Sequence, residues 1–170
     1  IRSLKMGTTR LVSRRRQDSG SKWVRVAMAV LATIGVIDTG SITLKRWGLL
    51  GDLNCPIGAD GCDKVLNSPW GSLGDGIPLS LVGVLAYGAV LLLALLPLLP
   101  GLQESKADLS RRTWWGLFAV SLGMTVFSGV LVGLMVIKIQ AFCFFCVLSA
   151  ALSLALFILS LVGGGWDDPA

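Results

Sequence analysis

Four cysteines are the side chains of this 170-residue sequence best suited to chemistry, and they form two pairs. Cys55 and Cys62 make a C-x6-C pair in a segment rich in Gly, Asp and Pro, whereas Cys143 and Cys146 make a C-x-x-C pair at the start of an apolar stretch. A C-x-x-C pair can open and close a disulfide within one helical turn; a helix N-terminus favours a thiolate there, whereas apolar burial opposes it, so the sequence does not fix the pKa of these thiols. The two pairs therefore indicate thiol–disulfide exchange.

The rest of the composition narrows both the chemistry and the class of protein. The sequence contains no histidine, which excludes His-ligated haem, zinc sites that use His, Ser-His-Asp triads and Cys-His nucleophiles. Hydrophobic residues make up 54% of the chain and charged residues 15%, with a mean hydropathy of +0.75. A soluble domain carries about 25% charged residues. The composition therefore excludes an ordinary water-soluble or disordered protein.

Four apolar stretches are long enough to cross a membrane as helices, which takes about 20 residues for a bilayer core of roughly 30 Å. They are residues 23–44, 77–99, 114–139 and 142–162. This pattern predicts an all-α integral membrane protein, a four-transmembrane-helix bundle in which residues 23–162 form the catalytic domain.

The segments outside the spans are short. In the first loop, residues 45–76, an apolar face at helical spacing predicts a short half-helix lying on the bundle or in the membrane interface. The residues of this face are Val65, Leu66, Trp70 and Leu73. Glycines at 163–165 are expected to end the fourth helix, and residues 163–170 to form a tail that begins a linker to a further segment.

Basic residues are concentrated in residues 1–22, which contain one acid, Asp18. The loop between the second and third spans also carries more bases than acids, whereas the first loop carries more acids. By the positive-inside rule, both termini and the second loop face the cytoplasm or stroma, and all four cysteines face the opposite, more oxidising side. Beside a span, such a basic segment sets topology and contacts anionic lipid, so no nucleic-acid role is expected.

The surroundings of the two pairs suggest different roles for them. Phe142, Phe144 and Phe145 flank the C-x-x-C and, with the apolar bundle, could hold a flat apolar redox molecule, for which a membrane quinone is the natural candidate. A mobile loop pair could carry electrons from a soluble partner to that site by successive exchanges. Together the pairs would form a relay that needs no metal.

Three other interpretations of the cysteines stay open at this stage. The loop pair could be a static staple, and the C-x-x-C could be core packing, which would suit a structural assembly factor with inert disulfides. All four thiols could instead bind Zn²⁺ or another soft metal, as in a soft-metal transporter or a metal-binding membrane protein.

The order and sidedness of these motifs resemble the vitamin K epoxide reductase homologues of bacteria and plastids. The disulfide-bond protein B family, also a four-span bundle, has its C-x-x-C in the first exported loop instead. The resemblance extends from the first span to the end of the fourth and rests on Cys55, Cys62-Asp63, Val65-Leu66-Asn67-Ser68, Gly76-Ile77-Pro78 and Cys143-Phe144-Phe145-Cys146.

The resemblance implies a quinone-dependent thiol–disulfide oxidoreductase that supports disulfide bond formation. Electrons from a thioredoxin-like protein would enter at Cys55. Cys62 would then exchange with Cys143, and Cys146 would be the sulfur adjacent to the quinone. Ser68 matches a family serine near the active site, although its hydroxyl could equally serve as a helix cap or turn.

The resemblance also implies partners and a location. Many relatives carry the thioredoxin-like domain fused at the C-terminus, so here that domain is expected in a further segment or as a separate protein. The quinone would be phylloquinone, menaquinone, ubiquinone or plastoquinone. The membrane would be a bacterial or cyanobacterial inner or thylakoid membrane, or a plastid thylakoid, with the active site on the periplasmic or lumenal side.

One ionisable residue, Asp38, falls inside the first predicted span, where a charge is costly and indicates function. We expect it in the exported half of the span. There it would either belong to the quinone site as a proton donor or be a neutral acid hydrogen-bonded between helices.

Overall fold

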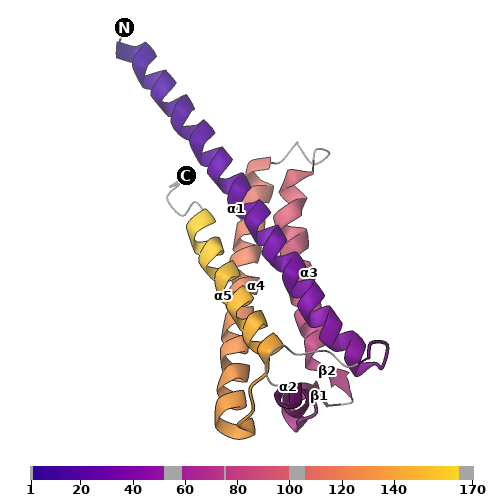
Figure 1. The fold of residues 1–170 in the computed structure, drawn as a ribbon. Helices are drawn as coiled ribbons and strands as arrows, with labels where there is room; N and C mark the ends of the chain where they lie inside the picture. The colour runs from indigo at the N-terminus through magenta and orange to yellow at the C-terminus, as the bar shows by residue number, and fades with distance from the viewer. Residues whose placement is uncertain (1, 52–58, 75, 100–105, 165–170) are drawn as a thin grey trace.

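Four long helices stand side by side in a computed structural model that describes residues 2–51, 59–74, 76–99 and 106–164 (Figure 1). They are α1 (Arg2–Arg46), α3 (Leu79–Leu95, extended by the 3-10 turn η2, Leu96–Leu98), α4 (Lys106–Leu134, extended by the π-helical turn η4, Met135–Ile139) and α5 (Phe144–Gly163). Each contains a stretch long and apolar enough to cross a membrane: Ser21–Arg46, Leu79–Leu98, Asp108–Ile139 and Phe144–Gly163. The predicted four-helix membrane bundle is confirmed.

Two helices begin earlier than the apolar pattern indicates. α1 is continuous from residue 2 through the basic segment, and α4 starts at Lys106 rather than near residue 114. Hydropathy marks only the apolar part of a helix, whereas backbone hydrogen bonding continues into polar turns that prefer helix. Most of the tail, residues 165–170, lies outside the described residues.

The first loop forms a small cap at the end of the bundle away from the N-terminus (Figure 1). The predicted half-helix is present as α2 (Ala59–Leu66), but Trp70 and Leu73 lie beyond it, in the turn η1 (Pro69–Gly71) and strand β1 (Ser72–Leu73). Pro69 lacks an N–H and favours extended backbone at the preceding residue, so the helix cannot continue. β1 pairs antiparallel with β2 (Ile77–Pro78).

Close packing of α1 against α3 centres on small residues, which let helix backbones approach in a membrane. A Cβ atom at Gly35 would overlap the ring of Tyr87, and one at Gly83 would lie 2.8 Å from a methyl group of Thr39. The Tyr87 ring is fully buried, and its hydroxyl donates a hydrogen bond to the Ser149 carbonyl of α5 at 2.8 Å. Tyr87 therefore ties three helices together.

At the opposite end of the bundle, Arg25 joins α1 to two other helices. Its guanidinium donates to the Leu93 carbonyl at 3.4 Å, to Ser110 at 3.2 Å and to the Thr113 hydroxyl at 3.1 Å. It also lies 4.4 Å from the centre of the Trp114 ring. Carbonyl, hydroxyl and π-face contacts of this kind compensate for removing the cation from water.

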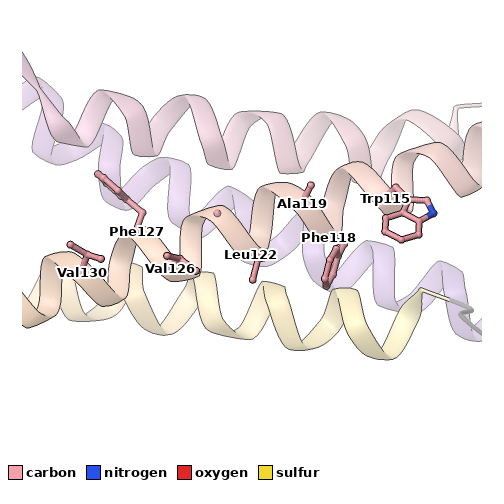
Figure 2. A pocket seen from close by; sticks show the side chains of 8 residues that line it. Trp115, Phe118, Ala119, Leu122, Val126, Phe127 and Val130 are labelled. Atoms are coloured by element: carbon pink, nitrogen blue, oxygen red, sulfur yellow. The ribbon is translucent and has the colours of Figure 1, made fainter.

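The outward side of α4 is apolar from Trp115 to Val130. Side chains of this helix line a shallow surface groove of about 670 Å³. Figure 2 shows them between α3 and α5: Trp115, Phe118, Ala119, Leu122, Val126, Phe127 and Val130. An open face that is almost entirely apolar suits contact with lipid chains.

We predict that Gly35→Ala destabilises the bundle by about 1–3 kcal/mol, the usual cost of overpacking a core. The Tyr87 ring cannot retreat, because it is buried and held at its hydroxyl. The matched control is Gly40→Ala in the same helix, where an added Cβ meets no atom within 4 Å. The control should be neutral or stabilise by up to about 1 kcal/mol. Thermal unfolding in detergent tests the pair, and equal effects of the two substitutions would contradict the prediction.

Candidate functional site

The loop helix α2 is attached to the end of α1 by two basic side chains. Lys45 forms an ion pair with Asp63 at 2.8 Å. Arg46 donates to the carbonyl of Leu66, the last residue of α2, and lies 3.5 Å from the Asn67 side-chain oxygen. Because Lys or Arg near a helix C-terminus also interacts favourably with its dipole, these contacts hold α2 in a defined orientation.

The opposite side of α2 lies directly against the connection between α4 and α5. A Cβ atom at Gly61 would collide with the backbone carbonyl oxygen of Phe142. Backbone cannot rotate away as a side chain can, so only glycine fits at this contact. Gly61 therefore allows the next residue, Cys62, to approach the start of α5.

The connection itself has an unusual backbone. α4 widens into the π-helical turn η4, and Gln140 adopts a left-handed conformation with φ of 50°. Such conformations are costly for a residue other than glycine and are often found near functional sites. The turn brings Cys143, in extended backbone, to the N-cap position of α5.

Three of the four cysteines meet at this point. Cys62 and Cys143 are buried together with Met135, and Cys146 packs against this cluster. Hydrogen bonding with Cys146, followed by burial, raises the pKa of the Cys143 thiol well above its usual range, while a hydrogen bond with Cys62 acts in the opposite direction. Cys143 is therefore a protonated thiol at neutral pH, located between two potential exchange partners.

Cys55, the remaining member of the loop pair, lies outside the described residues. Its distance from Cys62 therefore stays a matter of prediction.

A cavity of about 460 Å³ opens beside the thiol cluster, within the size range of small-molecule sites. Its wall is mostly aliphatic and aromatic, with a few hydroxyl-bearing residues from the four long helices and the loop. Cys146 and Phe145 belong to this wall, and Ser68 lies in it while donating a hydrogen bond to the Val65 carbonyl at 2.7 Å. An apolar cavity with isolated hydroxyl donors and an adjacent sulfur fits the head group of a quinone.

The other residues expected at a quinone site lie around the cavity rather than in its wall. Phe142 is half exposed, and Phe144 makes an edge contact with the Phe145 ring at 6.0 Å between centres. Asp38 is buried in α1, and its neighbour Thr39 lines the cavity. Of the residues that the sequence placed at the quinone site, Ser68 and Phe145 thus line the cavity, whereas Phe142, Phe144 and Asp38 do not.

The cavity also contains residues that the sequence analysis did not identify. Tyr87, the only tyrosine of the chain, and Ser149 both lie in the wall. A signal for Ser149 existed, since it follows Cys146 by three residues and so shares its face of the helix. No comparable local signal existed for Tyr87 or for Gly61.

Comparison with known proteins supports one family. The model of the vitamin K epoxide reductase family matches residues 26–161. The thiol-disulfide oxidoreductase LTO1 of Arabidopsis thaliana is 33% identical over 134 residues, which cover 74% of this chain and 33% of that protein. The chain thus spans about a third of the length of this relative. The resemblance noted from the cysteine motifs is confirmed, and the chain belongs to the vitamin K epoxide reductase family.

Proposed function

We propose that this protein is a membrane thiol–disulfide oxidoreductase that oxidises the dithiol of a thioredoxin-like partner and passes the electrons to a membrane quinone. The observation that carries the proposal is the buried contact of Cys62, Cys143 and Cys146 beside an apolar cavity. The name of the Arabidopsis relative supports the thiol–disulfide part. The apolar cavity beside Cys146 supports the quinone part.

The proposed relay runs from the loop to the cavity. The partner's dithiol reduces the Cys55–Cys62 disulfide, and the Cys62 thiol then attacks Cys143, the sulfur it contacts, which forms a Cys62–Cys143 disulfide and frees Cys146. Attack of the Cys55 thiol on Cys62 re-forms the loop disulfide and frees Cys143. Cys146 is left facing the cavity, where two electrons leave the dithiol as its disulfide re-forms. The net reaction converts a partner dithiol and a quinone into a partner disulfide and a quinol.

The surrounding residues and the orientation are part of the same proposal. Phe145 and Ser68 would contact the bound quinone, and Phe142 and Phe144 would support the thiol cluster from outside. Residues 23–162 would form the catalytic unit, with residues 1–22 on the cytoplasmic or stromal side and 163–170 leading towards a further segment. The cysteine-bearing end would face the periplasm or the lumen of a bacterial or plastid membrane.

We predict that Cys143→Ala and Cys146→Ala each reduce quinone reduction by a dithiol to the uncatalysed rate, because either change removes the terminal disulfide. The measurement is quinone absorbance, together with thiol trapping of the purified protein with and without quinone. Undiminished turnover in either variant would contradict the proposal. Stoichiometric zinc on protected thiols, with no response to quinone, would favour a metal-binding protein instead.

We predict that Gly61→Ala slows electron transfer from a thioredoxin-like protein by about 10-fold or more, because a misplacement of 1 Å can cost 10²-fold in a positioned reaction. Reduction by dithiothreitol, which can reach Cys143 or Cys146 without the loop, should change little. The matched control is Gly51→Ala, since an added Cβ at Gly51 meets no atom within 4 Å. Equal losses with both reductants would show that Gly61 does not act through the loop relay.

The raised pKa of Cys143 predicts an alkaline loss of stability in the reduced protein. The folded state favours the protonated thiol, so this contribution is complete below the pKa of an unfolded cysteine, about 8.5, and is lost as the pH rises above it. The melting temperature of the reduced wild type should therefore fall more between about pH 7.5 and 9.5 than that of reduced Cys143→Ala. The wild-type protein with its Cys143–Cys146 disulfide formed is the control, because Cys143 then has no thiol to ionise. Parallel curves of melting temperature against pH for the reduced wild type and the reduced variant would refute the prediction.

A further inference from the structure

Asp38 is the feature of the bundle that the thiol relay leaves unexplained. Its side chain is buried, with a relative exposure of 6%, and neither carboxyl oxygen has a hydrogen-bond partner. Among the side chains that the structure describes, these two oxygens are the only buried polar atoms without a partner. A buried polar group in that state is costly, so a functional reason for its retention is expected.

The position of Asp38 connects it to the cavity through Tyr87. Gly35 and Asp38 share one face of α1, and Gly35 lies against the Tyr87 ring. Tyr87 belongs to the cavity wall, so the face of α1 that carries Asp38 packs against a side chain of that wall, although no hydrogen bond joins the Asp38 carboxyl to Tyr87 in the structure.

Tyr87 is in turn joined to Ser149. Its hydroxyl donates to the Ser149 carbonyl at 2.8 Å and lies 3.0 Å from the Ser149 hydroxyl. Ser149 follows Cys146 by one helical turn, and both line the cavity. The hydroxyl pair therefore belongs to two residues of the cavity wall, and one of them, Tyr87, packs against the α1 face that carries Asp38.

No charged residue balances Asp38 from the helices packed against α1. The titratable side chains within α3 and α5 are Tyr87 and Cys146, and the basic residues of the α1 span lie near its two ends: Lys22 and Arg25 at one, Lys45 and Arg46 at the other. An ionised carboxylate without donors or a counter-charge is strongly disfavoured in a membrane interior. The resting form is a neutral carboxylic acid, which carries one O–H donor.

We propose that Asp38, Tyr87 and Ser149 form a proton relay that delivers a proton to the oxygen of a quinone bound beside Cys146. This inference rests on the proposed function. When the Cys143–Cys146 disulfide forms, two S–H bonds break, two electrons leave the sulfurs and two quinone O–H bonds form. One proton reaches the quinone oxygen near the sulfurs directly. The other comes from Asp38 through the two hydroxyls, and the carboxylate recovers the second proton that the thiols release.

The proposed proton relay gives a reason for Asp38 to lie outside the cavity wall rather than in it. The two oxygens of a para-quinone are on opposite edges of its ring, so thiols near one edge cannot protonate both. A hydroxyl can accept one proton while donating another, which makes the Tyr87 and Ser149 pair suited to transfer. Asp38 thus stores a proton without placing a charge in the cavity.

The kinetic test uses Asp38→Asn, Tyr87→Phe and Ser149→Ala, with Ser160→Ala as the matched loss of a buried hydroxyl elsewhere in α5. General acid catalysis contributes about 10²-fold or more, so kcat for quinone reduction should fall by about 100-fold in Asp38→Asn and Tyr87→Phe, with little change in KM. The double variant that combines Asp38→Asn with Tyr87→Phe should be no slower than either single variant, because both changes interrupt the same relay. Thiol exchange between Cys62 and Cys143 and the activity of Ser160→Ala should stay at wild-type values.

An infrared difference spectrum, recorded on adding quinone to the oxidised protein, provides a readout that does not depend on turnover. A shift of the protonated carboxyl band that disappears in Asp38→Asn and changes in Tyr87→Phe supports the relay. Wild-type kcat in Tyr87→Phe, or a carboxyl band insensitive to quinone, overturns it even if Asp38→Asn fails to fold. A wild-type protein that exchanges thiols but never reduces quinone overturns the proposed function itself.

Discussion

The close approach of α2 to the first turn of α5 is the constraint on which the site depends. Cys62 and Cys143 can exchange a disulfide only if their sulfurs come into contact. That contact exists because Gly61 has no side chain to collide with the Phe142 backbone, and because the Lys45–Asp63 ion pair holds α2 from its other side. The hydrogen bond of Cys143 with Cys146 and the burial of Cys143 then raise the pKa of its thiol.

The bundle supports this contact through a few polar side chains inside an apolar protein. Arg25 fastens three helices at one end, and Tyr87 joins α1, α3 and α5 near the cavity. In a membrane, the hydrophobic effect contributes little between helices, so close packing and hydrogen bonds determine how they assemble. The same Tyr87 side chain that joins the helices also belongs to the cavity wall, which couples the stability of the fold to the geometry of the site.

Much of the fold and part of the candidate site were predictable from the sequence, because they follow from local patterns. Apolar length identified four spans, and cysteine spacing identified the family. Helix ends were less predictable, since α1 and α4 continue into polar turns that hydropathy does not register. The half-helix was expected to include Trp70 and Leu73, but Pro69 ends it sooner. Tyr87 was missed because its link to Ser149 joins positions far apart in the chain.

The sequence by itself determined the class of protein, the topology signals and the thiol chemistry, because residue type and spacing act locally. Only the tertiary structure decided that Gly61 faces the Phe142 carbonyl, that the described cysteines form one buried cluster, and that a cavity lies beside Cys146. It also decided that Asp38 has no hydrogen-bond partner. These features depend on how separate helices meet, and such contacts arise from packing across the bundle rather than from any single segment.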